Sequence, residues 1–405
     1  MKVETESPSR IAGAPVAVLL CFALPLPGQT RPPEPKPLAL AQAPRNGEAH
    51  LVGLADGTGW LRIPSRCKPG VPARLVVWLH GANGSGYEHQ IALASRGLGR
   101  DEILLCPNGA KRSADWTYNH GGGPGPILAA IEAVTQRHPA SAVYLGGHSQ
   151  GAFLSFRLLG EHAERFAGVV AVSGGLAGGF DAAALVARLG ARTPALVIAH
   201  GERDPVVGIA QGDQAYERCL AAKWPALRYV HPPRADHSLE HFDLAECFGW
   251  IFALTSDRPQ ELLATARGLA GGDRPGDALF ALARAEANKA PAAAVQAVRK
   301  LALARGAVLQ RQWLDRFAEP KKSGWSEAFY EQSAGLITVP TAAPMFAAFQ
   351  QLAAAQTPAA TQALTEALEL ARTDPARARS ACERILAEHP AALAACRAAA
   401  LYLRR

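Results

Sequence analysis

The sequence lacks any C-x-x-C pair and any long run of basic residues, and only 19% of its 405 residues are charged. The missing cysteine pairs argue against a zinc knuckle or a thioredoxin-type redox site. No basic run is longer than the pairs Lys321–Lys322 and Arg404–Arg405, so we expect no nucleic-acid partner. Apolar residues make up 49% of the chain and its mean hydropathy is +0.01, which excludes a wholly disordered chain and a polytopic membrane protein.

The sequence also contains no metal-ligand spacing, no P-loop and no G-x-G-x-x-G motif directly after a strand-like segment. These motifs are the usual sequence marks of metal, nucleotide and dinucleotide sites. We therefore expect a protein that works without a metal ion and without an organic cofactor.

The N-terminus carries one long apolar run, from Ile11 to Leu26, behind the basic residues Lys2 and Arg10. A run of about 16 residues suits a signal peptide better than a membrane span, which needs about 20. We expect export to the periplasm or the medium, while an uncleaved membrane anchor and a wrongly assigned start codon on a cytoplasmic protein remain open alternatives. Six cysteines remain after such a cleavage, and their spacing does not say which of them pair.

Three zones of different composition follow one another along the chain. Residues 1–45 form the leader and a proline-rich linker, and residues 46–256 alternate short apolar segments with helical patterns and glycine-rich turns. Residues 258–405 are rich in alanine, have helical spacing and hold +6 of the net charge of +7, with 19 basic against 13 acidic residues. The zones predict an α/β domain followed by an all-α domain.

The middle zone predicts a mostly parallel sheet. Eight segments have the length and apolar character of strands, at 50–54, 59–64, 73–80, 103–106, 142–146, 168–172, 195–200 and 226–231. Helical patterns separate the later segments, at 127–137, 151–161 and 211–222. Short apolar strands that alternate with helices favour a parallel sheet with helices on both faces. Because such sheets bind ligands at the carboxyl ends of their strands, the loops that follow the strands are where chemistry is expected.

The segment after the fifth strand fits the pattern G-x-S-x-G. Gly147, Ser149 and Gly151 supply its fixed positions, and an amphipathic helix follows. A turn tight enough to lift a serine side chain clear of the sheet leaves no room for a Cβ atom at the two glycines, and it strains the serine backbone. The position between strand and helix therefore predicts that Ser149 is a nucleophile.

A serine hydroxyl needs a base to take its proton and an acid to orient that base. Asp204 follows the strand at 195–200, and His237 lies in the loop after the last strand. The order Ser, Asp, His along the chain is that of the α/β-hydrolase triad. His231, His241 and Asp236 are alternatives for the two partners. We expect His231 at the strand end, His241 on the following helix, and Asp236 pointing away from its neighbour His237.

The loop after the third strand, 81–86, is rich in glycine and offers the pocket for the negative oxygen of a tetrahedral intermediate. The backbone N–H groups of Ala82 and Gln150 are the expected donors. His80, just before this loop, is expected to brace it rather than to take part in the chemistry.

Four segments together resemble the α/β-hydrolase superfamily: LVVWLHGANGSG at 75–86, GGHSQGA at 146–152, AHGERDPVV at 199–207 and RADHS at 234–238. More narrowly, they are similar to its small esterases of the phospholipase/carboxylesterase and polyhydroxybutyrate-depolymerase-like groups. The resemblance spans about residues 46–256. It implies an α/β-hydrolase fold, hydrolysis of carboxylic esters, and the same five site residues, namely Ser149, Asp204, His237, Ala82 and Gln150.

Two loops bear on the substrate. Only residues 173–194 separate the strands on either side of the usual lid position, which is enough for one loop and one helix. We therefore expect an open site for short acyl groups or exposed polymer ends. The longer loop 108–126 carries Trp116 and Tyr118, which are candidate walls of the substrate site.

The C-terminal zone contains two similar stretches, 275–293 and 375–392, each with the pattern of helix, proline-bounded turn and helix. They resemble tetratricopeptide-type hairpins, and a solenoid of such units needs about three repeats. We expect this zone to bind a protein partner or to position the enzyme. Alternatively, Trp325 and Tyr330 could lean over the site.

The leading hypothesis is a serine ester hydrolase. A serine peptidase or amidase, and a non-catalytic interaction protein, are the alternatives.

Overall fold

The computed structural model describes residues 35–55, 57–109, 123–317, 333–336, 339, 343–371 and 373–389, and beyond them only Ala392, Cys396, Ala399 and Leu403. The apolar run expected to be a signal peptide, and the aromatic candidates Trp116, Tyr118, Trp325 and Tyr330, lie outside the described residues. Within the described part of the chain, no helix combines the length and the apolar character that crossing a bilayer requires.

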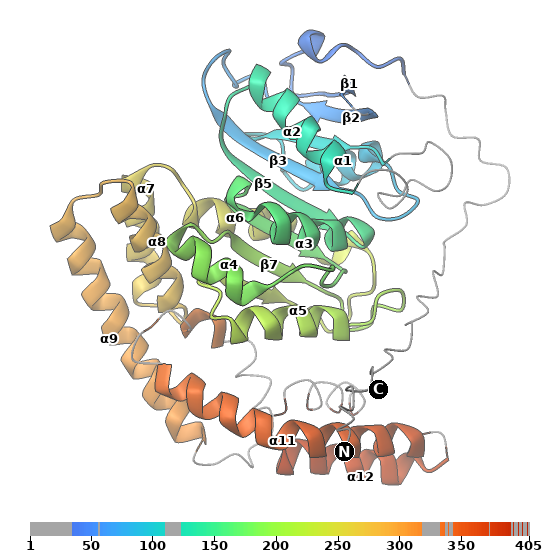
Figure 1. The fold of residues 1–405 in the computed structure, drawn as a ribbon, viewed down its shortest axis with the longest axis vertical. Helices are drawn as coiled ribbons and strands as arrows, with labels where there is room; N and C mark the ends of the chain where they lie inside the picture. The colour runs from blue at the N-terminus through green and yellow to red at the C-terminus, as the bar shows by residue number, and fades with distance from the viewer. Residues whose placement is uncertain are drawn as a thin grey trace, which may run out of the picture. The chain divides into compact units, whose positions relative to one another are not determined.

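One eight-stranded sheet organises the described chain, in the order β1-β2-β4-β3-β5-β6-β7-β8 (Figure 1). The strands are β1 (Ala49–Leu54), β2 (Gly57–Arg62), β3 (Ala73–Leu79), β4 (Ile103–Pro107), β5 (Ala140–His148), β6 (Gly168–Val172), β7 (Ala195–Ala199) and β8 (Leu227–Val230). From β4 to β8 every neighbouring pair is parallel, while β1 and β2 pair antiparallel at one edge. All eight predicted strands are present, and the mostly parallel sheet confirms the predicted fold class.

Alternate side chains of the central strands enter two different apolar cores. In β3, Leu75 and Val77 point into one core and Val76 and Trp78 into the other, and all four are fully buried. This is the period of two that a strand imposes. Because both faces are buried, the strand reads as an uninterrupted apolar run in the sequence.

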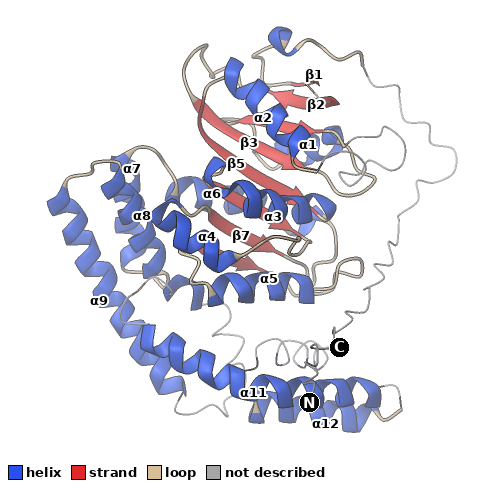
Figure 2. Ribbon diagram, in the orientation of Figure 1, coloured by secondary structure: helices blue, strands red, loops and turns tan. Residues whose placement is uncertain are grey.

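The first core lies under the helices on one face of the sheet (Figure 2). These helices are α2 (Gly125–Arg137), α3 (Gln150–His162), α4 (Ala182–Leu189) and α5 (Ala210–Ala221). The second core contains side chains of α1 (Gly86–Ser95), α6 (Leu244–Leu254), α7 (Pro259–Ala270), α8 (Pro275–Ala287) and α9 (Ala292–Phe317). The sheet is therefore covered on both faces, and the covering of the second face includes helices from the C-terminal zone.

The helices α7 to α9 contribute apolar side chains to the same core as the strands. Leu262 and Leu263 of α7, Phe280 of α8 and Val295 of α9 belong to one buried cluster with Val170 of β6. At about 1.5–3 kcal/mol for each fully buried large apolar side chain, this cluster is a sizeable part of what stabilises the second face. The boundary predicted at 256–258 stays a prediction, and the shared core bears on how it is to be tested.

Two helices of the C-terminal zone have buried residues at the same spacing. In α8 the buried residues include Ala278, Ala281, Leu282 and Ala285, and in α12 (Pro375–Glu388) they are Ala378, Ala381, Cys382 and Ile385. The two sets stand 100 residues apart and share the i, i+3, i+4, i+7 spacing of one helix face. With α11 (Ala343–Leu370), α12 forms a separate small apolar cluster of alanine, cysteine and isoleucine side chains. This spacing is typical of any helix that packs on one face, so the helical repeat stays a prediction.

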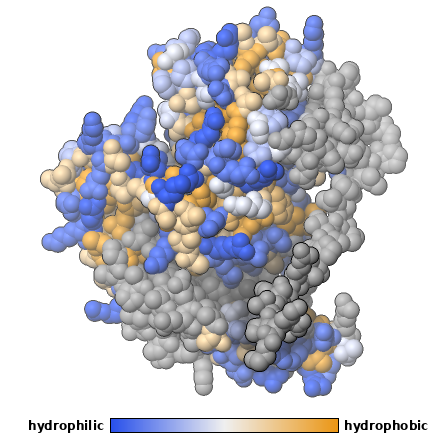
Figure 3. Space-filling view, viewed as in Figure 1, coloured by the Kyte–Doolittle hydropathy of each residue, from blue (hydrophilic) through white to orange (hydrophobic). Residues whose placement is uncertain are grey.

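Polar and charged side chains are dispersed over the face shown in Figure 3, between smaller apolar areas. Six cysteines are described, and all six are buried: Cys67, Cys106, Cys219, Cys247, Cys382 and Cys396.

Candidate active site

Ser149 occupies the turn between β5, which ends at His148, and α3, which begins at Gln150. Its backbone has φ 53° and ψ −119°, a positive φ that costs a residue with a Cβ atom about 1–3 kcal/mol. The Ser149 N–H donates to the carbonyl oxygen of Val172, at the end of the neighbouring strand β6, over 2.8 Å. The turn is thus the strained strand-to-helix elbow that the motif predicts.

The two glycines of the motif are required by close backbone approach. A Cβ atom on Gly147 would lie 2.3 Å from the carbonyl oxygen of Gly151, and one on Gly151 would lie 2.2 Å from the carbonyl oxygen of Leu79 in β3. Real Cβ atoms do not come this close to backbone atoms, so any larger residue would push α3 away from the sheet. These contacts give the physical reason for glycine at both positions.

Asp204 lies in the turn after β7, and its carboxylate is fully buried. Its Oδ1 accepts hydrogen bonds from the N–H groups of Val206 and Val207, each over 2.9 Å, and its Oδ2 is 2.7 Å from Nδ1 of His237. Burial by itself raises the pKa of this carboxyl, but the hydrogen bonds from His237 and from the two backbone N–H groups outweigh burial and lower the pKa below its usual value. Asp204 is therefore an ionised acceptor.

His237 lies in the loop after β8, and its side chain is 20% exposed, so one edge of the ring faces solvent. The competing groups have other partners. Asp236 Oδ1 accepts from the Ser238 N–H over 2.8 Å and lies 3.1 Å from Nε2 of His241. His241 lies in a short 3-10 turn rather than on the following helix, and Asp204 is the carboxylate that reaches His237.

The nucleophile turn and the loop of His237 lie side by side. Nε2 of His148, the residue before Ser149, is 2.7 Å from the backbone oxygen of His237, and the centroids of the two rings are 4.7 Å apart. Ser149, Asp204 and His237 follow the strands β5, β7 and β8, which belong to one parallel series. Three predicted positions, far apart in the sequence, thus lie along the carboxyl edge of the sheet.

The glycine-rich loop after β3 faces the nucleophile turn. A Cβ atom on Gly81 would lie 3.2 Å from the Cβ of Ser149, so Ala82 follows a residue in near contact with the serine. His80 is fully buried; its Nδ1 donates to the carbonyl of Gly81 over 2.7 Å, and its Nε2 accepts from the N–H of Gly109 over 3.0 Å. Burial lowers the pKa of His80 to about 4, so at neutral pH the ring is uncharged and braces the loop.

Sequence reasoning did not assign roles to three polar side chains near this edge. His148 reaches the backbone of His237, His89 accepts from Nε1 of Trp78 over 2.9 Å, and Glu202 pairs with His231 over 3.0 Å. No spacing rule in the sequence marks them, because their partners lie on other loops. Only the proximity of these loops in the fold identifies them.

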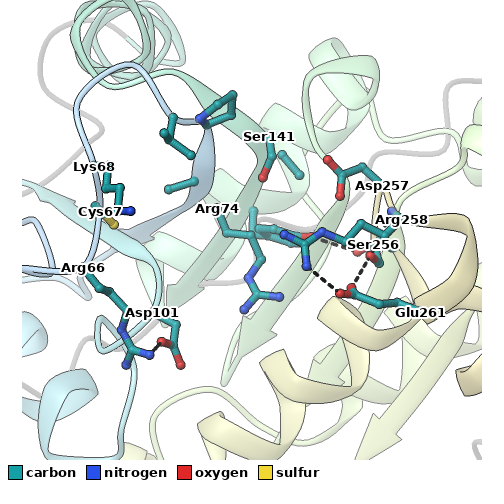
Figure 4. A pocket seen from close by; sticks show the side chains of 16 residues that line it. Arg66, Cys67, Lys68, Arg74, Asp101, Ser141, Ser256, Asp257, Arg258 and Glu261 are labelled. Carbon is teal, nitrogen blue, oxygen red and sulfur yellow. Dashed lines mark hydrogen bonds and ion pairs between the residues drawn. The ribbon is translucent and has the colours of Figure 1, made fainter.

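A charged cavity of about 300 Å³ lies at the other end of the strands, where β3 and β5 begin (Figure 4). Arg66 pairs with Asp101 and Arg258 with Glu261, while Arg74, which also lines the cavity, pairs with Glu102. The positive charges of these arginines are thus balanced by neighbouring carboxylates. The cavity is separate from the triad and has no residue of it in its lining.

Two further observations concern the surroundings of the site. Residues 173–194 contain α4 and a 3-10 turn at Gly190–Arg192, in keeping with the one loop and one helix expected there. Among the described residues, no cluster of three or more histidine, cysteine, aspartate or glutamate side chains could hold a metal ion.

Comparison with known proteins gives a family for the middle of the chain. Residues 129–241, which include Ser149, Asp204 and His237, match the family model Phospholipase/Carboxylesterase. No curated protein sequence matches the chain.

Solved structures with a similar fold include the S-formylglutathione hydrolase of Staphylococcus aureus, 18% identical, with a TM-score of 0.40 over 51% of this chain and 98% of the other. Another is the protein TT1662 from Thermus thermophilus, 24% identical, with a TM-score of 0.39 over 50% of this chain and 94% of the other. A third is the acyl-protein thioesterase 2 of Zea mays, 19% identical, with a TM-score of 0.35 over 51% of this chain and 99% of the other. Each likeness covers about half of the present chain.

The parallel sheet, the elbow at Ser149 and the family match to residues 129–241 lead to one conclusion. The sheet and the elbow have the arrangement of an α/β hydrolase, and residues 129–241 match the phospholipase/carboxylesterase family of that superfamily.

Proposed function

We propose that the protein is a serine hydrolase of carboxylic esters, with Ser149 as nucleophile, His237 as base and Asp204 as the acid that orients the base. The observation that carries the proposal is the 2.7 Å contact between Asp204 Oδ2 and His237 Nδ1, beside a serine held at positive φ in the neighbouring turn. A buried acid, a partly exposed histidine and a strained serine are the parts that this chemistry requires.

In the first half of the reaction, Nε2 of His237 takes the proton of the Ser149 hydroxyl while its oxygen attacks the ester carbonyl carbon. The tetrahedral intermediate collapses, the carbon–oxygen bond to the alcohol breaks, and the alcohol leaves with the proton from His237. The acyl group is now esterified to Ser149. In the second half, water attacks the same carbon, His237 takes the proton of the water and returns it to Ser149, and the carboxylic acid departs.

The backbone N–H groups of Ala82 and Gln150 are the proposed donors to the negative oxygen of both intermediates. Gln150 is the first residue of α3, so its N–H belongs to the positive end of the helix dipole. His80 supports the other donor by fixing the carbonyl of Gly81. Loss of one such donor typically costs about 3 kcal/mol of transition-state stabilisation.

Asp204 has two roles in this scheme. Its acceptance of the Nδ1 proton fixes the tautomer in which Nε2 of His237 is free to act as base, and its negative charge stabilises the imidazolium that forms. Because the N–H groups of Val206 and Val207 hold its other oxygen, the carboxylate keeps this orientation throughout the cycle.

The substrate is proposed to be an ester with a short acyl chain or an exposed polymer end. The short segment 173–194 leaves little chain for a lid after β6. Export behind a cleaved leader, and a protein partner for the helices after residue 258, are further proposals that rest on the sequence alone.

Covalent labelling tests the nucleophile. The purified protein is treated with a fluorophosphonate probe and the modified peptide is identified by mass; we expect the label on Ser149. Ser149→Ala should abolish labelling and lower ester turnover by several orders of magnitude, with an unchanged circular dichroism spectrum. A label on a different serine would refute the assignment.

Paired substrates test the bond that is cleaved. We expect p-nitrophenyl acetate to be hydrolysed and the matching p-nitroanilide to be left intact, since an amide needs protonation of a poorer leaving group. Comparable turnover of both would favour a serine peptidase or amidase.

A further inference from the structure

His148 reaches the loop of the proposed base from the nucleophile turn. Its Nε2 lies 2.7 Å from the backbone oxygen of His237, which is 89 residues further along the chain. A carbonyl oxygen only accepts hydrogen bonds, so Nε2 of His148 carries the proton and donates it. This nitrogen is therefore committed to the backbone, and His148 is not itself a base for Ser149.

The ring of His148 is uncharged at neutral pH. Burial, and after it the neighbouring His237, lower the pKa of His148 to about 4, against the smaller opposing effects of the hydrogen bond to His237 and of the Asp204 charge. The histidines His89 and His200 also face this region, and burial lowers the pKa of each of them too. A neutral donor at this place adds no positive charge beside the imidazolium that forms on His237 during catalysis.

The other edge of the His148 ring faces the proposed oxyanion loop. A Cβ atom on Gly81 would lie 3.2 Å from Nδ1 of His148 and 3.2 Å from the Cβ of Ser149. The ring is thus held between the glycine-rich loop, the nucleophile turn and the loop of His237, and it touches a part of each.

The loop of His237 is fastened to the turn of Asp204 by separate contacts. The Arg203 N–H donates to the carbonyl of Ala235 over 3.0 Å, and a Cβ atom on Gly201 would lie 2.5 Å from the carbonyl oxygens of Ala235 and Asp236. These contacts hold Ala235 and Asp236 against the turn of Asp204. The backbone oxygen of His237 itself is held by His148, and this hydrogen bond also joins the base to the turn that carries the nucleophile.

We propose that His148 is a positioning residue that holds the backbone of His237 against the nucleophile turn and so sets the distance between base and nucleophile. The inference rests on the proposed function, because it assigns His148 a role only if His237 is the base for Ser149. Asp204 orients the ring of His237 about its side-chain bonds, and His148 anchors the backbone that carries that side chain.

Two substitutions separate the hydrogen bond from the space that the ring fills. His148→Phe keeps a planar ring of similar size and removes the donor, and His148→Gln places an amide N–H near the position of Nε2. With p-nitrophenyl butyrate we expect His148→Phe to lower kcat roughly 10–100-fold with KM changed less than about threefold, since misplacement of a reacting group by about 1 Å can cost about 100-fold. His148→Gln should recover kcat to within about fivefold of the unaltered protein.

The pH profile supplies a readout that a structural role would not change. The hydrogen bond to Asp204 favours the protonated ring of His237. A loosened His237 loses part of this hydrogen bond, so its neutral ring becomes more favourable. The pH at which kcat/KM reaches half its maximum should therefore shift downward in His148→Phe and stay in place in His148→Gln. His162→Phe, a substitution at a partly exposed histidine at the end of α3, is the matched control and should leave both kcat and the profile unchanged.

The outcomes distinguish failure of the inference from failure of the proposed function. If Ser149→Ala and His237→Ala remain active, the proposed function is wrong. If those two variants are inactive while His148→Phe retains full kcat and an unchanged profile, the positioning role of His148 is wrong. Equal losses in His148→Phe and His148→Gln, with lowered melting temperatures and an unchanged profile, would also overturn it and assign His148 to packing alone.

Discussion

Glu202 and His231 form a buried pair, with 3.0 Å between Oε1 of the carboxylate and Nδ1 of the ring and side-chain exposures of 2% and 8%. The pair joins the turn after β7, which carries Asp204, to the end of β8, from which the loop of His237 departs. It therefore fastens together the two segments whose separation sets the contact between the proposed acid and base.

Glu202→Ala should lower both stability and activity. The substitution removes the carboxylate that Nδ1 of His231 contacts inside the protein, at a cost of about 1–3 kcal/mol, and it loosens the Asp204 turn. Urea unfolding and ester turnover measure the two effects. Glu202→Gln, which keeps an acceptor oxygen, should recover most of both, and Glu240→Ala, an exposed position in the same region, should change stability by less than about 0.5 kcal/mol. A Glu202→Ala variant as stable and active as the unaltered protein would contradict the fastening role.

Asp204→Asn should keep the fold and impair catalysis. The amide can still accept from Val206 and Val207, but as a hydrogen-bond donor to Nδ1 it favours the imidazole tautomer that has its proton on Nε2. We expect kcat to fall by roughly 10⁴-fold. Stopped-flow measurement of p-nitrophenol release checks this, and the parallel variant Asp236→Asn should retain kcat to within a few-fold. A larger loss in Asp236→Asn than in Asp204→Asn would mean that the acid has been misassigned.

His80 should make the protein less stable in acid. Burial lowers its pKa to about 4 in the folded protein, while in the unfolded chain the ring titrates near the ordinary value of about 6.5. Between these values the unfolded chain binds a proton that the folded protein does not, so stability falls as pH drops from about 6.5 to about 4, by up to roughly 1.4 kcal/mol per pH unit. The stability contributed by the neutral ring is thus fully present above pH 6.5.

The comparison of His80→Asn with the unaltered protein isolates this effect. Urea unfolding at pH 7 and at pH 4.5 gives the loss of stability for each, and we expect the loss to be smaller by about 2 kcal/mol in the variant. Comparing the change with pH, rather than the stability itself, removes any packing cost of the substitution. Identical losses in both proteins would show that His80 is not a buried neutral ring.

The rate of ester hydrolysis should fall as the acyl chain of the substrate becomes longer. With little chain available for a lid after β6, the site is expected to hydrolyse acetyl and butyryl esters faster than palmitoyl esters. Rates for the three p-nitrophenyl esters below their critical micelle concentrations check this. A preference for palmitate together with a jump in rate at the micelle surface would mean that another segment acts as a lid.

The C-terminal boundary can be tested by two truncations. Because α7 to α9 share a core with the sheet, and Leu336 and Val339 belong to the core under α2–α5, we expect a chain that ends at Asp257 to be insoluble. A chain that ends near residue 342 keeps these contacts and loses α11 and α12, which form their own small cluster. It should stay soluble and hydrolyse a small ester at close to the full rate. A soluble, fully active chain ending at Asp257 would instead support the boundary predicted from composition.

Local signals in the sequence predicted the elements that depend on local chemistry. The strands at 168–172 and 195–200 are apolar on both sides because both faces of the sheet are covered, so length and composition alone identified them. The elbow at Ser149 followed from glycines that leave no room for a Cβ atom, and the structure gives the contacts that require them. The antiparallel pairing of β1 with β2 and of β2 with β4 was not predicted, because pairing direction depends on which edge of the sheet a strand reaches.

Contacts between loops far apart in the chain were decided by tertiary structure alone. The order of Ser149, Asp204 and His237 along the chain indicated a triad. Nothing in the sequence indicated that His148 donates to the backbone of His237 or that Glu202 pairs with His231. The sequence also did not predict that α7 to α9 cover the second face of the sheet. The change to an alanine-rich composition indicates a domain boundary whether or not the helices pack on the sheet. A residue type and its spacing fix local geometry, whereas the partner of a buried side chain is set by which loops the packed sheet brings within hydrogen-bonding distance.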